Sequence, residues 1–290
     1  YLAAFTAAIL NNQPMGFYQP FTLIKDAQRH GLKVLPINIT CSDWLCTIEK
    51  QADETLAVRL GLMYVKGLSR GAGEAIVRAR AAGEFVGIDD LRNRVPALRK
   101  DELRKLAAVG ALNFIQSSTR RDALWQVERV TRAAGEMYEG LLESDGNSPL
   151  EQMTLTERVD ADFRGTGVTI GKHPVAYHRV ELNKLKALRA IDIRKLRDGT
   201  FVRVAGWVIV RQRPGTAKGF MFLSLEDETG VSNIIVTPQL FDKYRFELVD
   251  HPFLLIEGAL QNQDNVISVK ASHVQPLKFA VAATPSHDFH

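Results

Sequence analysis

The chain has 290 residues, which is enough for two or three domains that each bury a core of their own. Its 46% hydrophobic and 24% charged residues are ordinary for a soluble globular protein, and its apolar runs are too short for a transmembrane helix. The formal net charge is only +4, yet residues 57–133 hold fifteen Lys and Arg against eight Asp and Glu. Positive charge concentrated in one segment predicts contact with phosphates.

The N-terminal sequence and the cysteines predict a cytoplasmic protein. The first residues are apolar but lack the basic region and cleavage site of a secretory signal. Cys41 and Cys46 have no second pair and no neighbouring His, which fits reduced thiols better than a disulfide scaffold or a zinc site. Because the chain does not begin with Met, we expect a piece of a longer polypeptide.

The first fifty residues are divided by turn formers. The sequence predicts a helix over residues 2–10, a break at 11–16 where Asn, Pro and Gly gather, and a helix over 23–30. Residues 34–37 are expected to run extended.

A glycine-rich turn at residues 65–73 predicts the first of two tandem helix-hairpin-helix units. The helix that follows it is expected to end at Gly83. Free N–H groups at the start of such a helix, together with the helix dipole, favour a phosphate there. The candidate DNA contacts in this unit are Lys66, Gly67, Ser69, Arg70 and Gly71.

The second unit has its turn at residues 96–100, with Asp101 as the expected N-cap and Gly110 as the stop. Arg99 and Lys100 are its candidate DNA contacts. The alternative is an ordinary helical domain with glycine caps and solvated charges. The concentration of positive charge favours sequence-independent binding of a nucleic-acid backbone.

The middle of the chain changes from helix to linker and back. A long amphipathic helix is predicted over residues 120–142. Residues 143–171 are poor in large apolar side chains and are interpreted as a linker, and a short helix follows around 175–188.

The last third predicts a small barrel, because its hydrophobic period changes to two. Val202, Val204, Val208 and Val210 alternate with polar residues and Trp207 in the first of five expected strands, which are 202–211, 220–225, 231–236, 253–260 and 266–270. A short helix at 238–246 falls between the third and fourth strands, which is the element order of an OB-fold.

OB barrels commonly bind single strands by stacking bases on aromatic rings in a basic groove. The residues that supply such parts are Arg211, Arg213, Lys218, Phe220 and Phe222. Strand alternation puts the two rings on one face, which faces either the nucleic acid or the barrel core. Arg213 and Lys218 are therefore preferred over either ring.

Taken together, these pieces resemble the C-terminal region of bacterial C-family DNA polymerases of the alpha-subunit type. The shared pieces are residues 2–5, 34–38, 42–44, 60–62, 65–67, 110–112, 172–174 and 225–230. Residues 11–18 and 208–219, and an ending soon after the barrel, are most similar to the error-prone, damage-tolerant branch of the family.

The resemblance implies an α+β multidomain fragment that binds primer-template DNA in repair, translesion synthesis and damage-induced mutagenesis. The implied parts are distal fingers (1–55), tandem hairpins with the long helix (56–143), a linker with a short helix (144–190), the OB domain (191–277) and a tail (278–290). The parent would transfer nucleotides with Mg²⁺ held by palm carboxylates upstream of Tyr1. We assign this chain no catalytic residue and no metal or cofactor, and interpret Asp160 and Asp162, which imitate a palm motif, as solvated linker charges.

The implied partners are duplex and single-stranded DNA, damage-response accessory proteins and, weakly, a sliding clamp; no membrane contact is expected. Residues 152–156 have the Gln and Leu of a clamp-binding peptide but lack its aromatic anchor. Two other functions stay open, a stand-alone nucleic-acid-binding module and a protein–protein adaptor, because a fold alone does not fix function.

Overall fold

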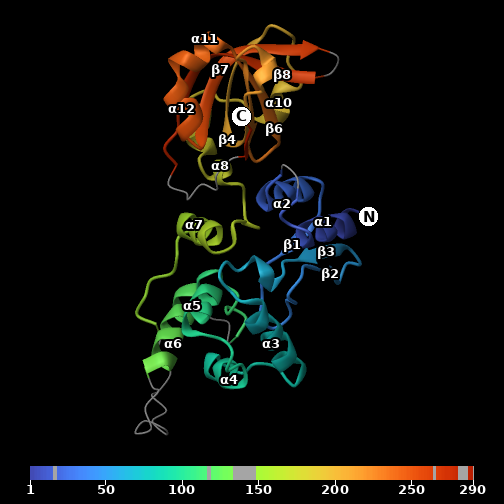
Figure 1. Cartoon of the computed structure of the whole chain (residues 1–290), viewed down its shortest axis with the longest axis vertical. Coiled ribbons are helices and arrows are strands. Elements are labelled where there is room, and N and C mark those ends of the chain that lie inside the picture. The colour runs from blue at the N-terminus through green and yellow to red at the C-terminus, as the bar shows by residue number, and fades with distance from the viewer. Residues whose placement is uncertain (16–17, 116–118, 133–147, 264–265, 280–286, 290) are drawn as a thin grey trace. The chain divides into compact units, whose positions relative to one another are not determined.

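A computed structural model describes residues 1–15, 18–115, 119–132, 148–263, 266–279 and 287–289 (Figure 1). The chain divides into two compact units. The first comprises Tyr1–Met15 and His30–Ile170, and the second comprises Gly16–Arg29 and Gly171–His290. In the described residues, no helix is long and apolar enough to cross a membrane.

The first unit begins with helix α1 (Leu2–Asn11) beside a small sheet. In that sheet β1 (Lys33–Leu35) pairs in parallel with β3 (Leu56–Arg59), and β2 (Thr47–Lys50) pairs with β3 antiparallel. The expected helix over 2–10 and the extended segment near 34–37 are confirmed. The partner strands β2 and β3 were not predicted.

The helical part of the first unit carries the two hairpins. Its elements are η1 (Leu62–Tyr64), α3 (Arg70–Ala81), α4 (Ile88–Arg94), α5 (Lys100–Ala108), α6 (Arg120–Arg132) and α7 (Leu155–Thr166). The long helix predicted over 120–142 is α6 as far as Arg132, and its expected remainder lies outside the described residues.

Helix α7 lies in the segment that the sequence analysis interprets as a linker. Thr154 and Glu157 form a capping box, in which Glu157 Oε2 accepts from the Thr154 N–H at 2.7 Å. Val159 and Phe163, one turn apart, are buried. A good cap and two apolar residues at helical spacing are enough to form a docked helix in a polar stretch.

The second unit is built on a barrel, and the OB-fold prediction is confirmed. Its strands are β4 (Phe201–Gln212), β5 (Met221–Glu226), β6 (Val231–Val236), β7 (Phe253–Gln263) and β8 (Val266–Pro276). The strand order β5-β6-β8-β7-β4 closes through a β4–β5 pairing, and β9 (His287–Phe289) adds to β4 in parallel. Two short helices, α11 (Pro238–Lys243) and α12 (Arg245–Asp250), replace the single predicted one and lie beside the barrel (Figure 1).

The barrel interior is filled by alternate residues of each strand, including Val204, Leu223, Ile234 and Ile256. Burying each large apolar side chain contributes roughly 1.5–3 kcal/mol. Gly206 is required in β4, because a Cβ there would lie 2.8 Å from the Glu226 carbonyl oxygen.

Trp207 is buried, although it alternates with the valines of the first strand as the polar residues do. It is on the face of β4 opposite the valines, yet only 1% of it is exposed. Its ring lies 5.1 Å from Phe21 on α2 (Pro20–Arg29) and 5.1 Å from Phe253. Helix α2, which is distant in sequence, covers this face, so hydrophobic alternation alone misses it.

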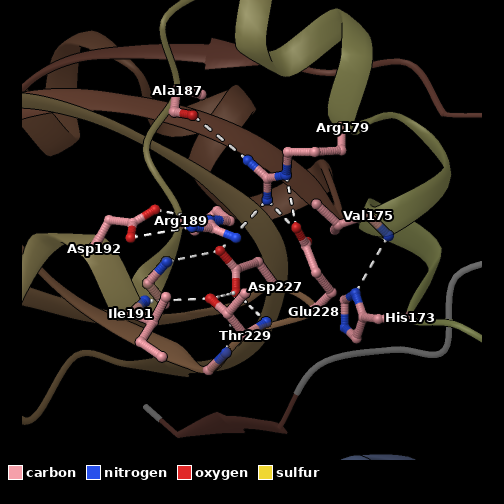
Figure 2. Close-up of polar contacts among 12 residues, drawn as sticks. His173, Val175, Arg179, Ala187, Arg189, Ile191, Asp192, Asp227, Glu228 and Thr229 are labelled. Carbon is pink, nitrogen blue, oxygen red and sulfur yellow. Dashed lines mark hydrogen bonds and ion pairs between the residues drawn. The ribbon is translucent and has the colours of Figure 1, made fainter.

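Hydrogen bonds and ion pairs connect the short helices before the barrel to the β5–β6 turn (Figure 2). The expected helix over 175–188 is divided into α8 (Pro174–Tyr177) and α9 (Arg179–Lys184), with α10 (Ala190–Ile193) after them. Asp227 accepts from the Ala190 N–H at 2.8 Å, and Arg179 pairs with Glu228 at 2.7 Å. Within residues 225–230, which carry the family resemblance, Asp227 and Glu228 therefore hold the short helices against the barrel.

Candidate nucleic-acid interface

The two hairpin turns share a closing hydrogen bond and an extended N-cap. In the first, the Leu68 N–H donates to the Val65 carbonyl at 3.0 Å, and Ser69 is the N-cap of α3 with φ −72° and ψ 146°. Gly67 has φ +76°, in the left-handed region that glycine adopts without strain. This turn leads directly into the N-terminus of a twelve-residue helix.

The second turn repeats this hydrogen bond and the extended N-cap, but Ala97, which stands at the place of Gly67, has no positive φ. The Leu98 N–H donates to the Val95 carbonyl at 3.0 Å, and the N-cap of α5 has φ −78° and ψ 157°. That N-cap is Arg99, so the prediction of Asp101 is wrong. The capping carboxylate is supplied instead by Glu102, one residue further along.

The start of α3 is open to a ligand. The Ser69 hydroxyl accepts from the Ala72 N–H, while the first N–H groups of a helix have no acceptor within it. A Cβ added to Gly71 would meet nothing within 4 Å, so the backbone there faces open space. A phosphate can approach this helix end closely.

The predicted basic contacts differ in their surroundings. Arg70 and Arg99 are the most open, each with 74% of its side chain exposed, although Arg70 also pairs with Glu74 on the next turn of α3. Lys100 lies 3.4 Å from Glu128 on α6. All three are at the starts of α3 and α5, beside the N-terminal N–H groups of these helices.

Lys66 is exposed, but its side chain makes a contact within the first unit. Its Nζ donates to the Phe163 carbonyl at 3.0 Å, at the C-terminal end of α7, and its backbone N–H donates to Gly165 at 2.8 Å. A cation at a helix C-terminus is favourable. Lys66 therefore ties the first turn to α7, a task that its sequence neighbours did not suggest.

Glu102 was not among the residues predicted from the sequence, yet it contacts both turns. Its Oε1 accepts from the Ser69 N–H at 2.8 Å and its Oε2 from the Arg99 N–H at 2.9 Å, so one carboxylate holds both N-caps. Burial raises the pKa of Glu102. The hydrogen bonds from these N–H groups lower it by more, so that the pKa is about 2. The capping-box spacing to Arg99 could have indicated half of this arrangement.

On the barrel, Arg211 does not reach the surface. A bulge between Val208 and Val210 shifts the register of β4, and Arg211 donates to the Leu248 and His251 carbonyls, both at 2.7 Å. These carbonyls are at the C-terminal end of α12, where a cation is favourable. Arg211 is a structural residue and leaves the set of candidate DNA contacts.

The other barrel candidates gather at the start of β5. Arg213 is exposed and its guanidinium lies over the Phe241 ring, 4.0 Å from the ring centre. Lys218 is exposed in the loop between β4 and β5. Phe222 is 38% exposed and Phe220 half-buried, and neither belongs to the barrel core.

Strand register places Phe222 in a row across the outer face of the barrel. Phe222 pairs with Ile235 of β6, and Ile235 pairs with Lys270 of β8. In the adjacent row Asn233 is exposed. Lys270 and Asn233 were not predicted, because only the pairing of distant strands brings them beside Phe222.

The carboxylates of Asp160 and Asp162 do not fit a metal site, and they are not solvated linker charges either. Both lie on α7, where Asp160 pairs with Arg164 at 2.9 Å and Asp162 with Arg120 at 2.7 Å. Across the described ranges, no group of three His, Cys, Asp or Glu is placed to hold a metal ion. The two carboxylates are instead engaged by arginines of their own unit.

The segment with clamp-peptide features is the start of a helix. Thr154 is the N-cap of α7 and Leu155 is its first residue, and both residues are exposed.

Cys41 is exposed and Cys46 buried, and both are free thiols.

Two protein-family models match this chain, one over the hairpin region and one over the barrel. Residues 31–123 match a family described as a helix-hairpin-helix motif, and residues 202–277 match an OB-fold nucleic acid binding domain. The asparaginyl-tRNA synthetase of Pyrococcus horikoshii aligns with 32% of this chain and 23% of its own, at 22% identity and a TM-score of 0.28, which is too low to inform function.

Relatives match nearly the whole chain. It is 40% identical over 99% of its length to the error-prone DNA polymerase of Anaeromyxobacter sp., and 40% identical over 99% to that of Burkholderia pseudomallei. Error-prone DNA polymerase 2 of Agrobacterium fabrum is 35% identical over 99%. The chain spans only 26–27% of the length of these relatives.

Proposed function

The chain belongs with the error-prone DNA polymerases as a segment of about a quarter of their length, and we propose that it is the C-terminal part that holds the DNA. The whole enzyme would be a DNA-directed DNA polymerase that acts in repair and translesion synthesis in the cytoplasm. We place its Mg²⁺-binding carboxylates outside this chain, and no catalytic step is assigned to the residues described above.

The observation that carries the proposal is the repeated turn. Two turns with the same closing hydrogen bond and an extended N-cap each lead into the N-terminus of a helix, α3 of twelve residues and α5 of nine. Each turn carries an exposed Arg, Arg70 in one case and Arg99 in the other. Helix N-termini with adjacent cations bind phosphates without reading bases. This suits an enzyme that must hold any primer-template duplex.

The test is a salt titration of duplex binding by the full chain, monitored by fluorescence anisotropy of a labelled primer-template. Replacing Arg70 and Arg99 by Ala should weaken binding and lower the slope of log affinity against log salt by up to about 0.9 for each phosphate that is no longer neutralised. The matched control replaces Lys50 and Arg78, which are also exposed cations of the same unit but lie away from the turns, and should leave the slope unchanged. An unchanged slope for the Arg70 and Arg99 variant contradicts the proposal.

We propose that the barrel binds the unpaired template strand through its outer face. Phe222 offers a ring for stacking. Lys270 is an exposed cation in the same row of the sheet, and Arg213 and Lys218 are exposed cations in the connection that leads into β5. Stacking of one base is worth roughly 1–3 kcal/mol, so Phe222→Ala should weaken oligo(dT) binding at low salt about five-fold or more. Phe246→Ala removes an exposed ring of α12 and is the control. If Phe222, Arg213 and Lys218 variants all bind oligo(dT) like the parent, a protein-binding role for the barrel is favoured.

A sliding clamp and damage-response proteins would be partners of the whole enzyme. Residues 152–156 stay outside this proposal, because Thr154 and Leu155 already form the capped start of α7.

A further inference from the structure

Glu102 connects the two turns in a way that a capping box alone does not require. Its Oε2 makes the local contact with the N–H of Arg99, three residues earlier. Its Oε1 makes a second contact with the N–H of Ser69, thirty-three residues earlier. The two N-cap nitrogens are therefore held by the two oxygens of one rigid, fully buried carboxylate.

The same helix adds a second contact to the first turn. Lys105 follows Glu102 on α5 and its Nζ donates to the Gly67 carbonyl at 3.3 Å. Helix α5 thus contacts the first turn at the residue before Leu68 and at the residue after it. Two side chains of α5, Glu102 and Lys105, thus hold the start of α5 against the first turn.

The two contacts of Glu102 leave the N–H groups of the first residues of α3 and α5 for a ligand. Glu102 accepts from the N-caps, Ser69 and Arg99, and not from the first residues of α3 and α5. Its negative charge would by itself repel a phosphate nearby, yet Arg99 lies 3.4 Å from it and offsets that charge. An acid at this position is explained by geometry, since a neutral side chain does not accept two N–H groups with two equivalent oxygens.

We propose that Glu102 is a positioning residue that sets the spacing of the two turns, so that both contact phosphates of one DNA duplex at once. This rests on the proposed duplex binding. Two weak sites held at a fixed distance bind as one, because the second contact forms at a high effective concentration after the first. When the spacing changes, each turn binds a phosphate alone and the two no longer add.

Two substitutions separate positioning from charge. Glu102→Gln keeps the size and removes the charge, and its NH₂ group faces one N–H donor that it cannot accept. Glu102→Asp keeps the charge but is one methylene shorter, so its two oxygens no longer span the Ser69 and Arg99 N–H groups, which lie 2.8 and 2.9 Å from the Glu102 oxygens. The matched control is Glu157→Gln, which changes the capping box of α7 and touches neither turn.

The experiment measures the affinity of the full chain for a primer-template duplex at several salt concentrations, with folding checked by circular dichroism. Both Glu102 variants should bind at least ten-fold more weakly and show a salt slope smaller by about 0.9, the equivalent of one phosphate, while Glu157→Gln keeps the parent slope. Hydrogen exchange should show faster exchange of the Ser69 amide in both Glu102 variants.

The outcomes distinguish this inference from the function on which it rests. If the unmodified chain does not bind duplex, the proposed function fails. If it binds and both Glu102 variants keep its slope, positioning by Glu102 is wrong. If Glu102→Gln binds more tightly than the parent, the carboxylate acts only as a repulsive charge, which also overturns the inference. Should Glu102→Gln not fold, Glu102→Asp decides between the same results.

Discussion

The β5–β6 turn should be fastened to the short helices before the barrel mainly through Asp227. This carboxylate is buried, accepts from the Ala190 N–H at 2.8 Å with Oδ2, and accepts from the Thr229 and Gly230 N–H groups at 2.7 and 3.0 Å with Oδ1 (Figure 2). Asp227→Ala leaves the buried N–H of Ala190 without an acceptor, whereas the half-exposed turn N–H groups can bind water instead. With about 1–3 kcal/mol for a buried donor left unpaired and a smaller loss at the turn, the second unit should lose about 3 kcal/mol.

Urea denaturation followed by the fluorescence of Trp207 measures this loss. Trp44 and Trp125, which belong to the first unit, are replaced by Phe so that only the second unit is observed. With an m-value of about 2 kcal/mol per M, the midpoint should fall by about 1.5 M for Asp227→Ala.

Two further variants calibrate the result. Asp227→Asn keeps one acceptor oxygen and should lose about half as much. Asp192→Ala removes only a surface pair with Arg189 and should leave the midpoint unchanged. A shift below about 0.3 M for Asp227→Ala would refute the reasoning, since it would mean that water replaces the carboxylate without cost.

Trp207→Ala should destabilise the second unit by about 3–5 kcal/mol in the same assay read by circular dichroism, because it empties the space between α2 and the barrel, and a loss under about 1 kcal/mol would contradict that packing. Since the folded pKa of Glu102 is about 2 against an ordinary 4.5, its stabilising contribution should be complete above pH 4.5 and disappear as the pH falls towards 2, so the acid titration of stability should be flatter in Glu102→Gln than in the parent. The chain alone should not incorporate nucleotides on a primed template with Mg²⁺, and incorporation that is abolished by Asp160→Ala and Asp162→Ala would show that these carboxylates do bind metal.

The fold could largely be predicted, because local patterns specify most of its elements. Period-two stretches indicated the barrel strands, and glycine and proline marked both hairpin turns. The errors occur where distant segments meet. Trp207 is buried because Phe21 on α2 packs on it, and α7 docks because Val159 and Phe163 are buried, and neither contact is visible in a local window of the sequence.

The candidate site was predictable at the level of turns and much less so at the level of side chains. Arg70 and Arg99 are exposed beside the helix starts as their spacing indicated. Lys66 and Arg211 look equivalent to them in the sequence, but each satisfies carbonyls at the end of a helix. A basic residue is assigned to DNA or to a helix end only when the fold shows what lies within its reach.

The attachment of Lys66 to α7 has a consequence for transplanting this region into another protein. The matched hairpin family ends at residue 123, yet the first turn donates hydrogen bonds to the carbonyls of Phe163 and Gly165. Gly165 in turn packs so closely on Val109, at the end of the second hairpin's helix, that any larger residue would collide with it. A graft that stops at the end of the motif would carry the turns without their support. The smallest portable piece extends through Gly167, where the left-handed residue ends α7.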